Sequence, residues 1–267
     1  MQGDYHILHF GLNEDFKPEL KIRNINNSNV ESRILQGVID VVVKPNKYCI
    51  GTYDGTSFKI CLRKIDKYNQ CYSCFKQSPK NLCAKCNGEK CLLDQKICPS
   101  HKIYLASFGN EIKIGVTSSK RFPLRVIEQG ADFASAIAET EDGLTARKIE
   151  KAIKEKFGIK DKITTYQKYE LINNDKAKEL GKELIRTTYY NIIDQINAEN
   201  KLDLDIIDLS YNYMEVKNSI YLLVEENTRI YGKIIGNKGH LIFIKNKEGL
   251  YTFNASSLIS RILSFSF

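Results

Sequence analysis

Cysteines crowd into one short stretch of this chain. Six of its eight cysteines lie between Cys71 and Cys98, and four of them form two C-x2-C motifs, Cys71–Cys74 and Cys83–Cys86. The stretch is rich in Lys, Asn, Gly and Pro and has no hydrophobic periodicity, which is typical of a segment that folds around metal. Four thiolates at this spacing suit the closed tetrahedron of a structural zinc ion. We therefore predict a Zn²⁺ site made by Cys71, Cys74, Cys83 and Cys86.

The remaining ligand-type residues leave a second metal site open, made by Cys91, Cys98 and His101. Its fourth ligand would be Cys49 or Cys61. Cys91 could instead replace Cys86 as a ligand of the first site. The alternative to metal is a pair of disulfides or scattered buried thiols, which an intracellular chain disfavours.

The composition is that of an ordinary globular protein. The chain has 267 residues, of which 42% are hydrophobic, and 40 Lys and Arg face 32 Asp and Glu, for a net charge of +8. The first residues lack the basic and apolar regions of a secretory signal, and no apolar run is long enough for a membrane helix. We therefore expect a cytoplasmic protein with no membrane partner.

Most of the excess positive charge lies beside the cysteines. Residues 59–102 contain ten Lys or Arg and three Asp or Glu, with Tyr68, Tyr72 and Phe75 interleaved. Cations for phosphates and aromatic rings for unpaired bases favour a nucleic-acid partner, RNA over DNA. The alternative is a solvated lysine-rich loop. The residues we expect to contact nucleic acid are Lys64, Lys67, Tyr72, Lys76, Lys80, Lys85 and Lys90.

Strand patterns fill both ends of the chain, and helical patterns fill its middle. The β-branched run 32–43 predicts a strand that stops at Pro45. Turn residues predict one hairpin from 48–51 and 57–62, and another from 103–108 and 111–116. Apolar spacing predicts helices over 124–129, 144–157 and 176–197, the last with Leu180, Leu184, Thr188, Ile192 and Ile196 on one face. Further strands are expected at 219–224, 229–235, 241–244 and 250–253.

A G-x-x-G sequence, Gly236 to Gly239, lies between two of these C-terminal strands. In a KH domain such a loop joins two helices and clamps an RNA backbone. Because the residues that follow read as a strand, we prefer a β-turn with Lys238 exposed.

Residues 102–158 resemble the core of the GIY-YIG nucleases. Lys102-Ile-Tyr104 lies where that family has its first motif, and Lys113-Ile-Gly115 lies where it has the second. Arg125 and Glu150 fall at the positions of the family's helix arginine and metal-binding glutamate. The cysteines, the sequence from His101 to Gly109, and Glu128-Gln-Gly-Ala131 together also look like an uncharacterised, largely archaeal zinc-containing family.

The resemblance implies candidate catalytic residues Tyr104, Lys113, Arg125 and Glu150. In the family, the second-motif tyrosine assists the attacking water, the arginine steadies the phosphate, and the glutamate binds a divalent ion, here Mg²⁺ or Mn²⁺. Lys113 replaces that tyrosine, and an exposed ammonium holds phosphate but does not accept the proton of water. Lys113 could act as the base only if burial lowered its pKa. Each residue also has a structural alternative: a strand aromatic for Tyr104, a pair with Glu128 for Arg125 and a pair with Lys154 for Glu150.

The expected fold class is α+β. It comprises an N-terminal β unit (1–70), a zinc-binding knuckle (71–101), a GIY-YIG-like core with a helical extension (102–200) and a C-terminal β unit (201–267), with the two β ends joining in space. The preferred function is a zinc-containing protein that binds RNA, tRNA among the candidates. The alternatives are an active metal-dependent GIY-YIG endonuclease, an RNA-modifying enzyme and a protein-interaction adaptor.

Overall fold

The computed structural model describes residues 3–53, 57–78, 86, 88, 89, 98–172, 174–214 and 216–265. The fold is mixed α+β, as the sequence predicts. The chain divides into two units, which we call the β unit (Met1–Asn81 with Met214–Phe267) and the α/β unit (Leu82–Tyr213). The boundary between them falls inside the cysteine-rich segment.

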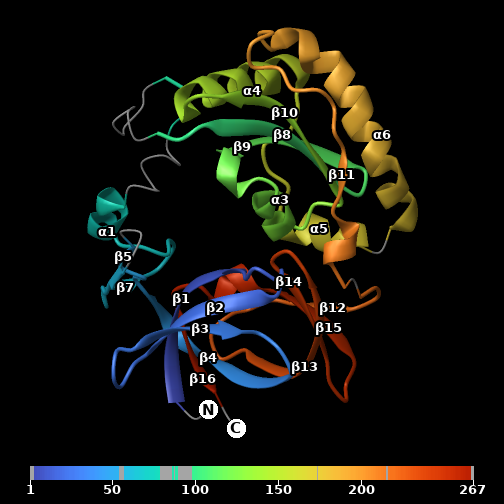
Figure 1. The fold of residues 1–267 in the computed structure, drawn as a ribbon. Helices are drawn as coiled ribbons and strands as arrows, with labels where there is room; N and C mark the ends of the chain where they lie inside the picture. The colour runs from blue at the N-terminus through green and yellow to red at the C-terminus, as the bar shows by residue number, and fades with distance from the viewer. Residues whose placement is uncertain are drawn as a thin grey trace. The chain divides into compact units, whose positions relative to one another are not determined.

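The β unit joins strands from both ends of the chain in one sheet (Figure 1). Its strand order is β12-β15-β14-β13-β4-β16-β1-β2-β3, and β7 also pairs with β4. C-terminal β16 lies between N-terminal β1 and β4, so the two β ends meet as expected. The strands are β1 (Gly3–Leu12), β2 (Pro18–Asn24), β3 (Val30–Ile34), β4 (Val38–Tyr48), β7 (Lys64–Ile65), β12 (Ile220–Leu222), β13 (Arg229–Lys238), β14 (Leu241–Lys245), β15 (Leu250–Asn254) and β16 (Arg261–Phe265).

Strand β4 shows how the sequence pattern becomes a core. Ile39, Val41 and Val43 alternate along it and are buried in the core of the β unit. The predicted strand 32–43 is wrong in its limits, because it is split at Gly37, whose φ of 75° suits glycine. Pro45 does not end β4, since the pairing with β13 stops at Val42 and the missing N–H of the proline is not needed there.

The G-x-x-G sequence lies in a β-hairpin, as preferred above. Strands β13 and β14 are antiparallel, with Lys238 opposite Leu241 and Gly239 in the turn at a φ of 54°. The expectation that Lys238 is exposed is wrong, because only 6% of the residue is accessible.

The α/β unit is built on a four-stranded sheet of order β11-β10-β8-β9. Helices α4 and α6 cover one face, over the buried side chains of Ile103, Leu105, Ile114 and Ile137, and α3 lies on the opposite face (Figure 1). The predicted hairpin of β8 and β9 and the predicted helix 144–157 are confirmed. The elements are β8 (His101–Phe108), β9 (Glu111–Ser118), α3 (Leu124–Gln129), β10 (Phe133–Thr140), α4 (Gly143–Phe157), α5 (Thr165–Ile172), α6 (Asp175–Ile192) and β11 (Ile207–Asp208).

Two features of this unit differ from the sequence prediction. Strand β10 is alanine-rich and was not predicted, although it is paired on both sides, with β8 and β11. The buried face of α6 is made by Ile185, Tyr189 and Ile192, whereas Leu180, which was expected on that face, is 57% exposed. Gly181 lies against Ser107 and Phe133, so the close approach of the helix to the sheet sets its rotation.

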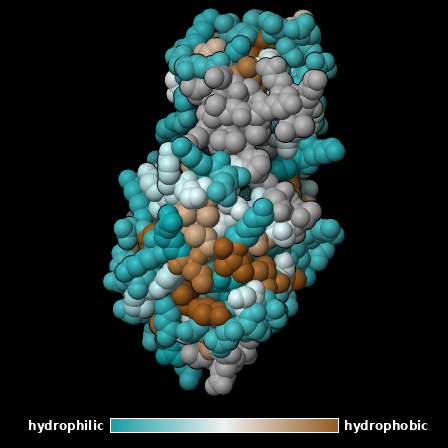
Figure 2. All heavy atoms as spheres, turned by 90° about the vertical axis from the view of Figure 1, so that its left-hand side faces the viewer, coloured by the Kyte–Doolittle hydropathy of each residue, from teal (hydrophilic) through white to brown (hydrophobic). Residues whose placement is uncertain are grey.

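Hydrophobic side chains gather on one face of the β unit, where they are surrounded by hydrophilic residues (Figure 2). Exposed hydrophobic residues of this unit include Val30, Ile34, Val38, Ile60 and Leu62. Of the helices in the part of the chain that the structure describes, none has the length and hydrophobicity that a membrane span needs.

Tyr104 and Gly115 stand opposite each other on β8 and β9, and the tyrosine ring lies over the glycine. A Cβ atom on residue 115 would lie 2.5 Å from the Tyr104 hydroxyl oxygen and 2.6 Å from the ring carbon that bears it. The absence of a side chain at Gly115 therefore fixes where the Tyr104 hydroxyl sits.

We predict that Gly115→Ala lowers the free energy of unfolding by about 1–3 kcal/mol, because it overpacks a buried site. Chemical denaturation of the full chain measures the change. The cost should shrink in a Tyr104→Leu background, which removes the atoms that clash. An equal cost in both backgrounds would show that the contact with Tyr104 is not its cause.

Candidate functional site

Four cysteines of the β unit lie together and could bind a metal ion such as zinc. The sulfur atoms of Cys49, Cys61, Cys71 and Cys74 all lie within 4.8 Å of one another. The Sγ atoms of Cys61 and Cys71 are 3.9 Å apart. Zinc–sulfur bonds of about 2.3 Å in a tetrahedron require sulfur atoms about 3.8 Å apart, so the residues fit a four-thiolate zinc site. We call these four residues the cysteine cluster.

Local backbone structure positions the sulfurs. Cys49 directly follows β4, Cys61 lies between β6 (Phe58–Lys59) and β7, and Cys71 and Cys74 lie at the start of helix α1 (Tyr72–Gln77). The N–H groups of Gly51 and Cys71 donate to the Cys49 sulfur at 3.4 and 3.2 Å. Such donors stabilise a thiolate.

Gly51 is required for this arrangement. Its φ is 77°, and a Cβ atom on it would lie 1.9 Å from the carbonyl oxygen of Lys59. β5 (Thr52–Tyr53) pairs with β6 just beyond it and carries the chain back toward Cys61. The predicted hairpin is therefore present, but its first strand is 52–53 and not 48–51.

The structure brings together two of the four predicted ligands. Cys71 and Cys74 are in the cluster, but their partners are Cys49 and Cys61, which the sequence offered only as fourth ligands of a second site. Cys86 is described and belongs to no such group, and Cys83 lies outside the described residues. The prediction paired motifs by their spacing along the chain, whereas the sheet brings strand ends together.

The second predicted site is not formed by the residues that the structure describes. Cys91 lies outside them, and Cys98 and His101 belong to no group of three potential ligands. The Cys98 sulfur accepts the Gly143 N–H at 3.3 Å, and the His101 Nδ1 lies 2.7 Å from the Pro99 carbonyl oxygen.

The charge environment of the cluster favours ionisation at one sulfur. The backbone N–H of Cys74 lowers the pKa of Cys71 to about 7, whereas burial raises the pKa of Cys74 and of Cys49. A bound metal ion would stabilise all four sulfurs as thiolates, including those of Cys49 and Cys74, whose ionisation burial disfavours.

Basic and aromatic side chains lie close in sequence to three of the cluster's cysteines, Cys61, Cys71 and Cys74. Of the residues predicted to contact nucleic acid, Lys64, Lys67, Tyr72 and Lys76 are exposed in the β unit, and the Lys76 ammonium lies 4.5 Å from the centre of the Tyr72 ring. Tyr68 and Tyr72 are each 70% exposed. The other three predicted residues lie outside the described residues: Lys80, Lys85 and Lys90.

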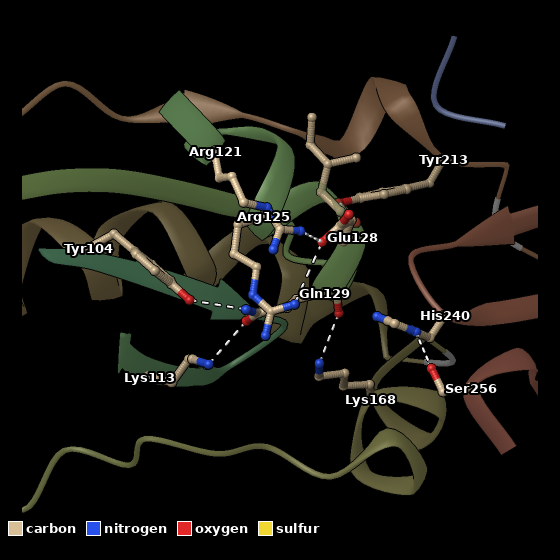
Figure 3. Close-up of polar contacts among 11 residues, drawn as sticks. Tyr104, Lys113, Arg121, Arg125, Glu128, Gln129, Lys168, Tyr213, His240 and Ser256 are labelled. Atoms are coloured by element: carbon tan, nitrogen blue, oxygen red, sulfur yellow. Dashed lines mark hydrogen bonds and ion pairs between the residues drawn. The ribbon is translucent and has the colours of Figure 1, made fainter. Parts of the chain in front are cut away.

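In the α/β unit, three side chains form a buried polar network on the face of the sheet that α3 covers (Figure 3). The Lys113 ammonium donates to Oε1 of Gln129 at 3.0 Å, and Nε2 of Gln129 donates to the Tyr104 hydroxyl at 3.0 Å. None of the three is more than 9% exposed. The expectation that Lys113 is exposed is therefore wrong.

Two arginines lie beside this network (Figure 3). Arg121 and Arg125 both approach the carboxylate of Glu128, at 2.6 and 3.6 Å, so the pair predicted between Arg125 and Glu128 is present. Their side chains are 51% and 40% exposed. One carboxylate therefore meets two accessible guanidinium groups.

Burial dominates the protonation of the network. It lowers the pKa of Lys113 to about 8, with a further contribution from Arg125 that the charges of Glu150 and Asp161 oppose. Burial raises the pKa of Tyr104, so the phenol is neutral and can donate a hydrogen bond. The site thus offers a neutral hydroxyl, an ammonium and a guanidinium, all of which suit an anion.

Glu150 lies on α4, and its carboxylate accepts a hydrogen bond from Arg147 at 2.6 Å. Its pairing partner is thus Arg147 and not Lys154, whose ammonium binds Asp161 at 2.7 Å. No hydrogen bond or ion pair joins Glu150 to Tyr104, Lys113 or Arg125, all of which are described. The structure therefore brings Tyr104 and Lys113 together, with Arg125 beside them, while Glu150 pairs with Arg147 and acts on Tyr104 and Lys113 through its charge alone.

Sequence reasoning missed the residue that links the network. Gln129 carries no charge and has no motif of its own, although it lies in the Glu128-Gln-Gly-Ala131 sequence noted above. Its position is set by the last turn of α3, which ends at Gly130 with a φ of 77°.

Comparison with known proteins places this chain in a family. A family model described as "Protein of unknown function (DUF2797)" matches residues 38–258, which is most of the chain. The chain belongs to the DUF2797 family. The matched range contains the cysteine cluster of this DUF2797 protein and also its polar network. No curated protein and no solved structure matches the chain.

We predict that Cys49→Ser lowers the zinc bound to the DUF2797 protein by about one ion per chain, because a closed site needs four thiolates. Elemental analysis of protein purified without chelator measures this. Ser73→Ala, which changes an exposed residue of α1, is the control and should keep the wild-type zinc content. Equal zinc in Cys49→Ser and wild type would exclude Cys49 as a ligand.

We also predict a pH-dependent contribution of Lys113 to stability. Because its pKa is lowered to about 8 in the folded protein from an ordinary value of 10.5, the unfolded chain binds more protons between these two values. The free energy of unfolding contributed by Lys113 therefore rises with pH across this window and is constant below it.

Urea denaturation at about pH 7 and about pH 9.5 tests this, because the wild type should gain stability relative to Lys113→Met at the higher pH. Lys162→Met, which changes an exposed lysine of the same unit, gives the baseline. A wild-type advantage that stays constant between the two pH values would contradict the prediction.

Proposed function

We propose that this DUF2797 chain is a zinc-containing protein that binds single-stranded nucleic acid, RNA in preference to DNA, and holds the phosphate backbone at Lys113 and Arg125. The observation that carries the proposal is the charge of Lys113. Its ammonium is buried, and its hydrogen-bond partner among the described residues is a neutral amide. The charges of Glu150 and Asp161 act on Lys113, but neither carboxylate pairs with its ammonium. A buried cation without a directly paired carboxylate is costly, and a bound phosphate would compensate it.

The neighbours of Lys113 support an anion. Arg121 and Arg125 share Glu128, which leaves guanidinium N–H groups for a phosphate oxygen. The Tyr104 hydroxyl lies at the other end of Gln129 and can donate to a second oxygen. Tyr104, Lys113 and Arg125 come from β8, β9 and α3, and Arg121 comes from the short 3-10 turn (Ser119–Arg121) that precedes α3.

The surface of the β unit supports the same partner. Tyr68 and Tyr72 expose large rings, and Lys67 and Lys76 lie over them with ammonium-to-centroid distances of 5.8 and 4.5 Å. Base stacking on such rings is indifferent to sequence, and neighbouring lysines contact phosphates. RNA is favoured because its loops and ends present unpaired bases.

The resemblance to the GIY-YIG core also supports a phosphodiester ligand. The order β8–β9–α3–β10–α4 begins with a hairpin followed by a helix, as the resemblance implies, and Tyr104, Arg125 and Glu150 keep the family's residue types. The zinc ion would be structural, because four thiolates leave no coordination position for water.

One observation favours an active nuclease as the second candidate. With a pKa of about 8, Lys113 has a neutral fraction of roughly a tenth at pH 7, and a neutral amine could accept a proton from water. Glu150 would then bind Mg²⁺ or Mn²⁺. Against this, the Glu150 carboxylate is held by Arg147 at 2.6 Å, and a metal ion would have to displace that guanidinium. Binding without cleavage is therefore the preferred function.

We predict that Lys113→Met weakens binding of a single-stranded RNA oligonucleotide about tenfold or more, because it removes a charge-assisted hydrogen bond to phosphate. Glu150→Gln should bind as tightly as the wild type. Fluorescence anisotropy at low salt measures both, with Lys162→Met as the control for loss of one positive charge. Equal losses of affinity in Lys113→Met and Lys162→Met would show that the loss comes from the change in net charge and not from a contact of Lys113.

The same samples incubated with Mg²⁺ or Mn²⁺ distinguish the candidates. Intact RNA after incubation with the wild type supports the binder. Cleavage that Glu150→Gln abolishes would establish the nuclease instead. A protein that neither shifts nor cuts RNA or DNA at low salt would favour an adaptor for other proteins.

A further inference from the structure

A cavity of about 390 Å³ lies in the α/β unit beside the proposed phosphate site. Its walls include the ring of Phe122, the side chain of Lys102 on β8, and the extended segment that precedes β11. The volume is within the range of small-ligand pockets, about 300–1,000 Å³. Every lining residue belongs to the same unit as Lys113, so the cavity and the polar network are both parts of the α/β unit.

The cavity adjoins the polar network through Phe122. The Phe122 ring centre is 5.8 Å from that of Tyr104, and Ala136, another lining residue, lies directly opposite Tyr104 in the pairing of β10 with β8. Phe122 also follows Arg121 directly and precedes Arg125 by three residues. A nucleic-acid strand with one phosphate bound at Arg121 and Arg125 would therefore place a neighbouring base near the Phe122 ring.

The lining has two chemical parts. One is flat and apolar, with the Phe122 ring, Ala136 and Leu202. The other is polar, with the carboxylates of Asp203 and Asp205 and the ammonium of Lys102. Asp203 and Asp205 are exposed and make no hydrogen bond or ion pair through their carboxylates with the residues that the structure describes. Ionised carboxylates only accept hydrogen bonds, and an ammonium only donates them.

We propose that this pocket binds an unpaired guanine base of the nucleic acid, an inference that rests on the proposed function. Guanine carries two adjacent donors, N1–H and the N2 amino group, which match the two oxygens of one carboxylate. It also carries the O6 acceptor, which suits Lys102. Adenine, cytosine and uracil each present one donor group on that edge. The ring of Phe122 supplies the stacking surface that any base needs.

The test uses full-length protein and short single-stranded RNAs that are uniform except for one central base: guanine, hypoxanthine, adenine, cytosine or uracil. Fluorescence anisotropy should show the guanine strand bound roughly tenfold more tightly than the others, as expected for one bidentate pair. Hypoxanthine lacks only the N2 amino group, so its strand should lose most of the preference.

Variants assign the preference to the pocket. Asp203→Asn and Asp205→Asn keep the shape of the side chain but replace one acceptor oxygen with an amide donor. At least one of them should bring the affinity for the guanine strand close to that for the others. Phe122→Leu should weaken binding of all strands. Asp194→Asn removes the same charge from an exposed residue outside the pocket, and it should keep the full preference.

The outcomes separate this inference from the proposed function. Equal affinity for all five strands would overturn the guanine assignment while the binding function stands. A preference for guanine that survives in both Asp203→Asn and Asp205→Asn would place its recognition elsewhere. Absence of binding to every strand would overturn both proposals together.

Discussion

In the α/β unit, the buried ammonium of Lys113 has a neutral amide, that of Gln129, as its hydrogen-bond partner. The candidate site depends on this pairing. Removing a charge from water costs several kcal/mol unless an opposite charge compensates it. Gln129 accepts one N–H of the ammonium and donates an amide hydrogen to Tyr104, so hydrogen bonding is maintained. The charges of Glu150 and Asp161 partly offset that of the ammonium, but neither carboxylate pairs with it. Arg125 adds to the excess and lowers the pKa of Lys113 further. An anion would stabilise such a site, and on the proposed function that anion is a phosphate of the nucleic acid.

Strand register delivers this chemistry. Tyr104 lies opposite Gly115 on one side and Ala136 on the other, and Lys113 lies opposite Ala106. Small residues thus flank the two large side chains, which gives the Tyr104 ring room to lie over the sheet. A slip of one residue between β8 and β9 would turn Lys113 to the face that α4 and α6 cover. In the native register that face is occupied by Ile112 and Ile114. The apolar residues of that face therefore specify the polar face as well.

Local patterns predicted the parts of the molecule that local patterns control. The hairpin of β8 and β9 and helix α4 follow from turn residues and apolar spacing, whereas Tyr104, Lys113 and Arg125 were singled out by the resemblance to the GIY-YIG core. Cys71 and Cys74 were found because they form a C-x2-C motif. Cys49 and Cys61 were assigned to another site because only the sheet brings them to Cys71, and Gln129 was missed because an amide has no signature outside its contacts. Strand β10 was missed because alanine has little β-propensity, and pairing on both sides outweighs that preference.

On the proposed function, the two units contribute different parts of recognition. The β unit offers exposed tyrosines and lysines, and stacking with phosphate contacts depends little on sequence. The α/β unit offers fixed donors and a shaped cavity, which can discriminate between bases. Covalent linkage of two modest binding surfaces raises their joint affinity without new contacts, because the second binding event becomes intramolecular. Selectivity can then come from the α/β unit alone, while both units contribute to affinity. The buried cation of Lys113 costs stability, but it contributes to recognition of the phosphate.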